Sequence, residues 1–178
     1  MIFALGAIIM TAMSVHLLAL LQGSGYSLAA AIGLSAIVGP CQVGARVIDI
    51  LNPRASTAWT SVASGLFTAL GLLLVTVMPQ AAIVGIALYG AGNGLRAIVR
   101  GTLPLLIWSS PEYPVVLGRM ARPALLCQAA TPVAGGYLME VMGAHITLWC
   151  LCVVAVLNAA LVVLLLRTLQ RRKASSGQ

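Results

Sequence analysis

Few side chains in this sequence can do chemistry, and those few lie inside long apolar stretches. The clearest are His16, Gln42, Asn93, Arg96 and Gln128. A histidine titrates near neutral pH, so His16 can carry a proton or bind a solute. The cation of Arg96 can attract an anionic solute, and the three amides can both donate and accept hydrogen bonds. We take these five residues as candidates for binding a substrate or lining a cavity.

Each candidate also has a purely structural interpretation, and the sequence leaves both open. A neutral His16 can bond to a neighbouring helix, and an amide can join two helices. Arg96 and Arg100 are four residues apart, so they share one face of a helix. Both can extend along that face to place their charges at a membrane boundary.

Other kinds of chemistry have no candidates. The three acidic residues, Asp49, Glu112 and Glu140, are scattered, and none lies in the middle of an apolar run. A membrane-embedded enzyme would need clustered His, Asp or Glu side chains. The four cysteines lack the C-x-x-C spacing of a metal or redox site. We therefore expect no enzymatic activity, no metal and no cofactor.

The apolar stretches predict an all-α integral membrane protein. Apolar residues make up 61% of the chain and charged residues 7%, whereas soluble domains carry roughly 25% charged residues. A helix that crosses a bilayer needs about 20 apolar residues. Barrel strands would alternate polar and apolar residues, which these stretches do not. We expect six spans in one domain over residues 1–166: residues 2–21, 28–50, 58–77, 81–100, 120–139 and 146–166.

The basic residues predict how the spans are oriented. All ten Lys and Arg residues lie at alternate breaks between spans or in the C-terminal tail. Cytoplasmic loops are the ones enriched in these residues, so both termini are expected in the cytoplasm. Residues 167–178 are expected to form a basic, disordered cytoplasmic tail. The net charge of +7 then reflects topology and contacts with the lipid bilayer rather than binding of nucleic acid.

Three stretches resemble the C-terminal six-helix half of a major facilitator superfamily transporter. They are residues 38–46 (VGPCQVGAR), 89–104 (YGAGNGLRAIVRGTLP) and 118–124 (GRMARPA). The resemblance implies two inverted repeats of three helices, a bacterial inner membrane, and transport of a small solute by alternating access. It also implies a cavity lined by the first, second, fourth and fifth spans, which carry His16, Gln42, Asn93 and Gln128.

The resemblance further implies a cytoplasmic gating loop and a partner. Arg46 and Asp49 are the gating candidates, although the loop lacks the adjacent Asp-Arg pair of the family. The family surrounds its cavity with two six-helix halves, and this chain supplies one. We expect a second half, either an N-terminal half or a parallel homodimer partner, and expect the isolated chain to be inactive. The alternative functions are a structural or assembly subunit of a membrane complex and, less favoured, a membrane-embedded enzyme.

Overall fold

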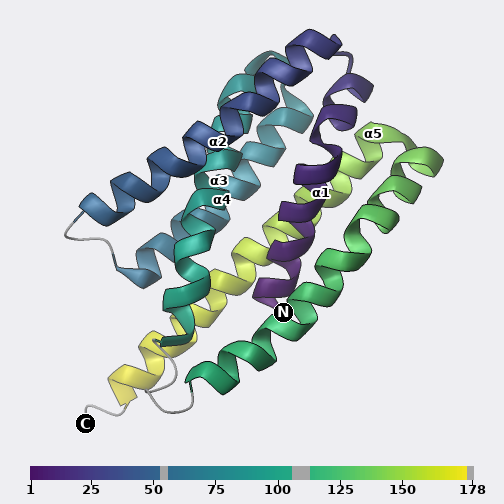
Figure 1. Ribbon diagram of the computed structural model, residues 1–178. Coiled ribbons are helices and arrows are strands. Elements are labelled where there is room, and N and C mark those ends of the chain that lie inside the picture. Colours follow the sequence, from purple (N-terminus) through teal and green to yellow (C-terminus); the bar gives the residue numbers. More distant parts are fainter. Residues whose placement is uncertain (53–55, 106–112, 176–178) are drawn as a thin grey trace.

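The computed structural model of the protein describes residues 1–52, 56–105 and 113–175, and the elements in these ranges are all helices (Figure 1). In chain order they are α1 (Ile2–Gly23), α2 (Leu28–Leu51), α3 (Thr57–Val77), the 3₁₀ turn η1 (Pro79–Ala81), α4 (Ala82–Leu105) and α5 (Tyr113–Ser175). The prediction of an all-helical protein is confirmed for the described residues.

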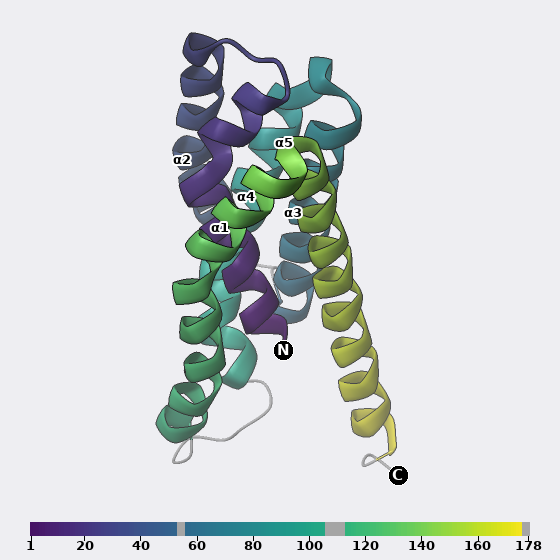
Figure 2. The same ribbon diagram turned by 90° about the vertical axis from the view of Figure 1, so that its right-hand side faces the viewer.

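In the part of the chain that the structure describes, five helices are long and apolar enough to cross a membrane, whereas the sequence analysis predicted six separate spans. The first four begin and end within a few residues of the predicted spans. The last two predicted spans are joined in α5, which departs from helical geometry at Gly143 (φ 81°, ψ 168°). This conformation is essentially restricted to glycine. The break is a single residue wide, and the two arms of α5 on either side of it run in opposite directions (Figures 1 and 2).

The ends of the helices separate into two groups. The start of α1 and the end of α5 point toward the same end of the bundle, together with the ends of α2 and α4 and the starts of α3 and α5 (Figure 1). Helix α5 continues to Ser175, so residues 167–175 are helical where a disordered tail was expected. Glu112, which the sequence analysis names, lies outside the described residues, and so does Arg54, one of the ten basic residues.

Helix α4 is packed between α2 and α3, and its glycines allow both contacts. The G-x-x-x-G pair Gly90 and Gly94 faces α2: a Cβ atom at position 94 would lie 2.4 Å from the carbonyl oxygen of Gln42. Gly92 faces α3, where a Cβ atom would lie 2.6 Å from the backbone nitrogen of Thr68. Small residues let membrane helices approach in this way. The close approach brings Gln42 beside the polar face of α4.

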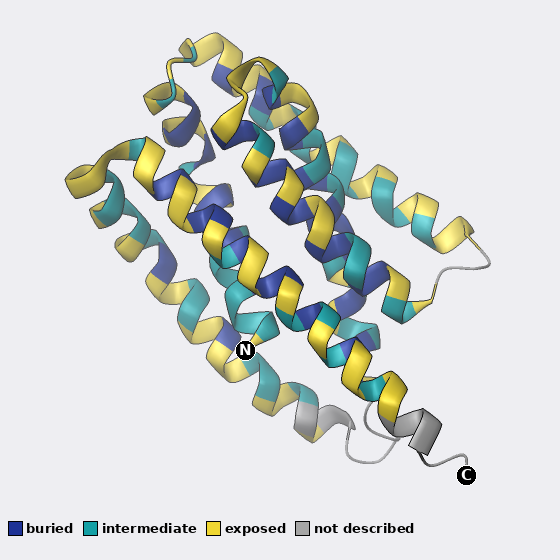
Figure 3. Cartoon of the chain, turned by 180° about the vertical axis from the view of Figure 1, so that it is seen from behind, coloured by how far each residue is buried: buried dark blue, intermediate teal, exposed yellow. Residues whose placement is uncertain are grey.

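The interior of the bundle and its outer surface are both apolar. Ile9, Met13, Leu72, Ile86 and Leu148 are fully buried in one core that joins α1, α3, α4 and the second arm of α5. Large apolar side chains are also exposed over most outer faces (Figure 3). Apolar surface of this extent is unusual for a soluble monomer and is compatible with contact with lipid. The described surface is therefore compatible with an integral membrane protein.

Candidate functional site

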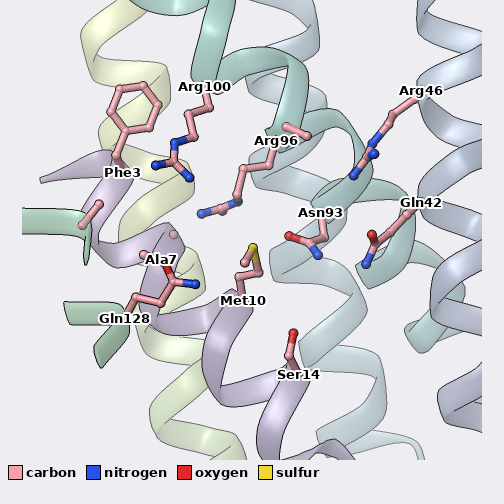
Figure 4. Close-up of a pocket in the computed structure, with 13 residues that line it drawn as sticks. Phe3, Ala7, Met10, Ser14, Gln42, Arg46, Asn93, Arg96, Arg100 and Gln128 are labelled. Atoms are coloured by element: carbon pink, nitrogen blue, oxygen red, sulfur yellow. The ribbon is translucent and has the colours of Figure 1, made fainter. Parts of the chain in front are cut away.

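A cavity of about 380 Å³ lies between α1, α2, α4 and the first arm of α5 (Figure 4). Small apolar residues, among them Gly6, Ala7 and Ala124, form part of its wall. Its polar lining comes from all four helices and consists of Ser14, Gln42, Arg46, Asn93, Arg96, Arg100 and Gln128. The cavity is therefore a place where polar side chains from four apolar helices meet.

The cavity brings together four of the five candidate residues, Gln42, Asn93, Arg96 and Gln128, and also the gating candidate Arg46. Helical spacing explains the placement within each element. Asn93 and Arg96 are three residues apart on α4, and Gln42 and Arg46 are four apart on α2, so each pair shares one face. Packing of α2 on the Gly90–Gly94 face then turns both pairs toward the same space (Figure 4).

Helix α1 contributes a residue that the sequence analysis missed. Gly6, Met10 and Ser14 are spaced four residues apart and form one stripe along the cavity wall. The guanidinium of Arg96 lies directly against Gly6: a Cβ atom at this position would be 1.3 Å from Nη1 of Arg96. The missing side chain at position 6 is therefore what makes room for Arg96. The regular spacing along α1 was visible in the sequence, but the partner of Gly6 was not.

The polar groups of the cavity are largely unpaired. Across residues 1–52, 56–105 and 113–175, the side chains of Gln42, Asn93, Arg96 and Gln128 form no hydrogen bond or ion pair. Asn93 is nevertheless only 9% exposed. Arg46 is partly engaged, because its Nε donates a hydrogen bond to the carbonyl oxygen of Gly94 at 3.1 Å. Several donors are thus left free to bind another molecule.

His16 does not line this cavity, although the sequence analysis grouped it with the other candidates. Its Nε2 lies 3.1 Å from the carbonyl oxygen of Pro132 on α5. A carbonyl oxygen only accepts hydrogen bonds, so Nε2 carries the proton and donates it. The ring also packs on Gly135, where a Cβ atom would lie 2.9 Å from it. His16 thus joins α1 to α5, which is the structural interpretation of this residue.

The second gating candidate, Asp49, is engaged on another helix. Its Oδ1 accepts a hydrogen bond of 2.7 Å from Oγ1 of Thr60, which ties α2 to α3. Arg46, three residues earlier, is bonded to α4 instead. The two gating candidates therefore hold α2 to different neighbours rather than to each other. The structure describes two acidic residues, Asp49 and Glu140. Asp49 is bonded to Thr60, and Glu140 is exposed, three residues before Gly143, where α5 reverses its direction.

The arrangement is suited to binding rather than to bond-breaking chemistry. The cavity lining has amides, guanidinium groups and one hydroxyl, but no general base and no nucleophile–base pair. In the part of the chain that the structure describes, no three His, Cys, Asp or Glu side chains are grouped to hold a metal. Comparisons with protein-family models, with curated proteins and with solved structures give no match. Function must therefore be inferred from the residues and their geometry.

Proposed function

We propose that the protein carries a small solute across a lipid bilayer. The observation that carries this proposal is a polar cavity that is formed by four apolar helices and lined by side chains without partners among the described residues. Unpaired polar groups are costly inside a membrane, and their presence there usually marks a path for an ion or solute. The cavity volume is within the range of about 300–1,000 Å³ that is typical of small-molecule sites.

The proposed mechanism is alternating access, as in the major facilitator superfamily that the sequence resembles. We propose six spans, with the two arms of α5 as the fifth and sixth, in a bacterial inner membrane with both termini in the cytoplasm. A second set of helices is needed to close the cavity on its open side. It is either a parallel copy of this chain or a separate N-terminal half. Gln42, Asn93, Arg96 and Gln128 would then contact the solute near the interface of the two halves.

A tandem fusion of two copies tests the proposal, because a flexible linker between two cytoplasmic ends enforces the parallel arrangement. The fusion would be reconstituted into liposomes that are bathed in a labelled metabolite extract, and the lumenal content would be measured by mass spectrometry. We expect at least one solute to enter liposomes that contain the wild-type fusion, and its rate of entry should saturate. Liposomes that contain the Asn93→Leu fusion should not take up that solute. Equal entry with both fusions would reject transport by a parallel pair. It would favour the alternative of an assembly subunit without a site of its own.

A further inference from the structure

The charge of the cavity suggests what kind of solute it takes. Three of its lining residues are cations, Arg46, Arg96 and Arg100. No carboxylate lines it among the residues whose positions are described, because Asp49 is bonded to Thr60 and Glu140 is exposed elsewhere. The remaining polar groups are neutral amides and a hydroxyl. The cavity thus carries a positive charge that no described protein group balances.

Arg96 carries the unpaired positive charge that lies furthest inside α4. It lies nine residues before the end of α4, about 14 Å along the helix axis at 1.5 Å per residue. Its side chain crosses the cavity toward α1 and stops against Gly6, instead of extending past Arg100 toward the helix end (Figure 4). A guanidinium that merely avoided the membrane would take the second course. An unpaired cation held across a cavity is stabilised when an anion joins it.

The neutral groups add hydrogen-bond donors that an anion can use. The amides of Gln42, Asn93 and Gln128 face the same space as Arg96 (Figure 4). Each amide has two N–H donors, and Asn93 is more than nine-tenths buried without a hydrogen-bond partner in the described residues. A guanidinium binds a carboxylate or phosphate through two parallel hydrogen bonds. Amide donors around it can satisfy the remaining oxygen atoms.

We propose that the cavity binds a small soluble anion that bears a carboxylate or phosphate group, with Arg96 as its central ligand. That this anion is the transported solute rests on the proposed function. Binding of the anion does not require that the protein transports it. A phospholipid headgroup offers the same chemistry, since Arg100, Arg119 and Arg122 are exposed and lie on the neighbouring parts of α4 and α5. Arg119 and Arg122 do not line the cavity, and the α5 residues that do, Ala124 and Gln128, lie further along the helix, which favours a free anion over a headgroup.

The test measures equilibrium binding to the full chain in nanodiscs of phosphatidylcholine. The probes are radiolabelled inorganic phosphate, succinate and glycerol 3-phosphate, with glycerol as the neutral control and choline as the cation. We expect one anionic probe or more to bind at least about tenfold more tightly than either control. Arg96→Gln should weaken that binding by about tenfold or more, and Arg96→Lys, which keeps the charge but loses the planar fork, should restore part of it.

Gly6→Ala provides a second variant that leaves every charge in place. Its methyl group would occupy the position of the Arg96 guanidinium, so we expect weaker anion binding in a folded protein. Gly39→Ala on α2, where a Cβ atom meets nothing within 4 Å, is the matched control and should bind as the wild type does. Size-exclusion profiles would show that each variant is folded.

Three results would overturn the inference. They are binding of no anionic probe, equal binding by the wild type and Arg96→Gln, and loss of probe binding when phosphatidylglycerol is added to the nanodiscs. The last result would identify the ligand as a lipid headgroup. Anion binding without solute entry in the tandem fusion would contradict only the proposed transport. Entry of an exclusively neutral solute would contradict only the anion site.

Discussion

The guanidinium of Arg96 occupies the space that a side chain at Gly6 would fill, with Nη1 only 1.3 Å from the position of the missing Cβ. The two residues are ninety positions apart in the sequence, on α4 and α1. The contact fixes how far the cation reaches across the cavity. It also makes the identity of residue 6 and the position of the charge depend on each other.

The first prediction is an energetic coupling between these two positions. In an Arg96→Ala background the guanidinium atoms closest to the methyl group of Gly6→Ala are gone, so the change should stabilise α1 by about 0.5–1 kcal/mol. With Arg96 present, the same change should be less favourable by about 0.5–3 kcal/mol, the usual range for residues in contact. Unfolding of the four proteins by dodecyl sulfate in mixed micelles measures the coupling. Additive effects would show that the two residues do not touch.

The second prediction separates His16 from the cavity. His16→Ala removes the hydrogen bond to the carbonyl oxygen of Pro132 and should lower the free energy of unfolding by about 0.5–1.5 kcal/mol. It should leave the affinity for anionic probes unchanged, because the ring does not line the cavity. A loss of affinity comparable to that of Arg96→Gln would place His16 in the binding site after all.

The third prediction concerns the contact between α2 and α4. Gly94→Ala places a methyl group 2.4 Å from the carbonyl oxygen of Gln42, a backbone atom that cannot move without the helix. We expect a loss of about 1–3 kcal/mol, as for overpacking in other cores. The bond from Arg46 to the carbonyl oxygen of Gly94 should weaken as well. Gly44→Ala, where a Cβ atom meets nothing within 4 Å, is the control and should be neutral or slightly stabilising.

The fourth prediction concerns the reversal of α5. Gly143 has φ 81° and ψ 168°, and no atom lies near the position of its Cβ. The cost of Gly143→Ala is therefore purely conformational, about 1–3 kcal/mol. Gly33→Ala on α2 has the same open surroundings but a helical backbone, and it should be stabilising. If Gly143→Ala and Gly33→Ala had the same free energy of unfolding, alanine would be tolerated at position 143 without conformational strain.

The fifth prediction concerns topology, and it follows from the distribution of the ten basic residues. A single cysteine introduced at Gln80 in η1, in a variant without the native cysteines, should react with an impermeant maleimide added to intact cells. A cysteine that replaces Arg171 should react only after the cells are opened. If the Arg171 position also reacts from outside, the proposed orientation is wrong.

The lengths of the apolar stretches in the sequence were enough to predict the first four helices. The first four predicted spans begin and end within a few residues of α1 to α4, because every backbone group in a membrane must be bonded within its own helix. The boundary between the last two spans is different. One glycine makes the reversal at Gly143, and a chain break this short leaves little trace in a hydropathy profile.

The candidate site was only partly predictable, for a physical reason. Polar residues inside apolar spans were visible in the sequence, and Gln42, Asn93, Arg96 and Gln128 do line one cavity. Whether a given side chain faces that cavity depends on helix rotation and on partners far away in the chain. His16 is directed to Pro132, 116 residues away, and no local pattern distinguishes it from Asn93. The role of Gly6 was hidden for the same reason.

The two glycine faces of α4 also have an evolutionary consequence. Every replacement of glycine introduces a larger residue, and at Gly85, Gly90, Gly92 and Gly94 even alanine would collide with a neighbouring helix backbone or side chain. Selection should therefore keep glycine at these four positions. The open positions Gly33, Gly39 and Gly44 on α2 should drift among relatives. A family of homologous sequences would then show α4 as a helix with two invariant glycine stripes beside a variable α2.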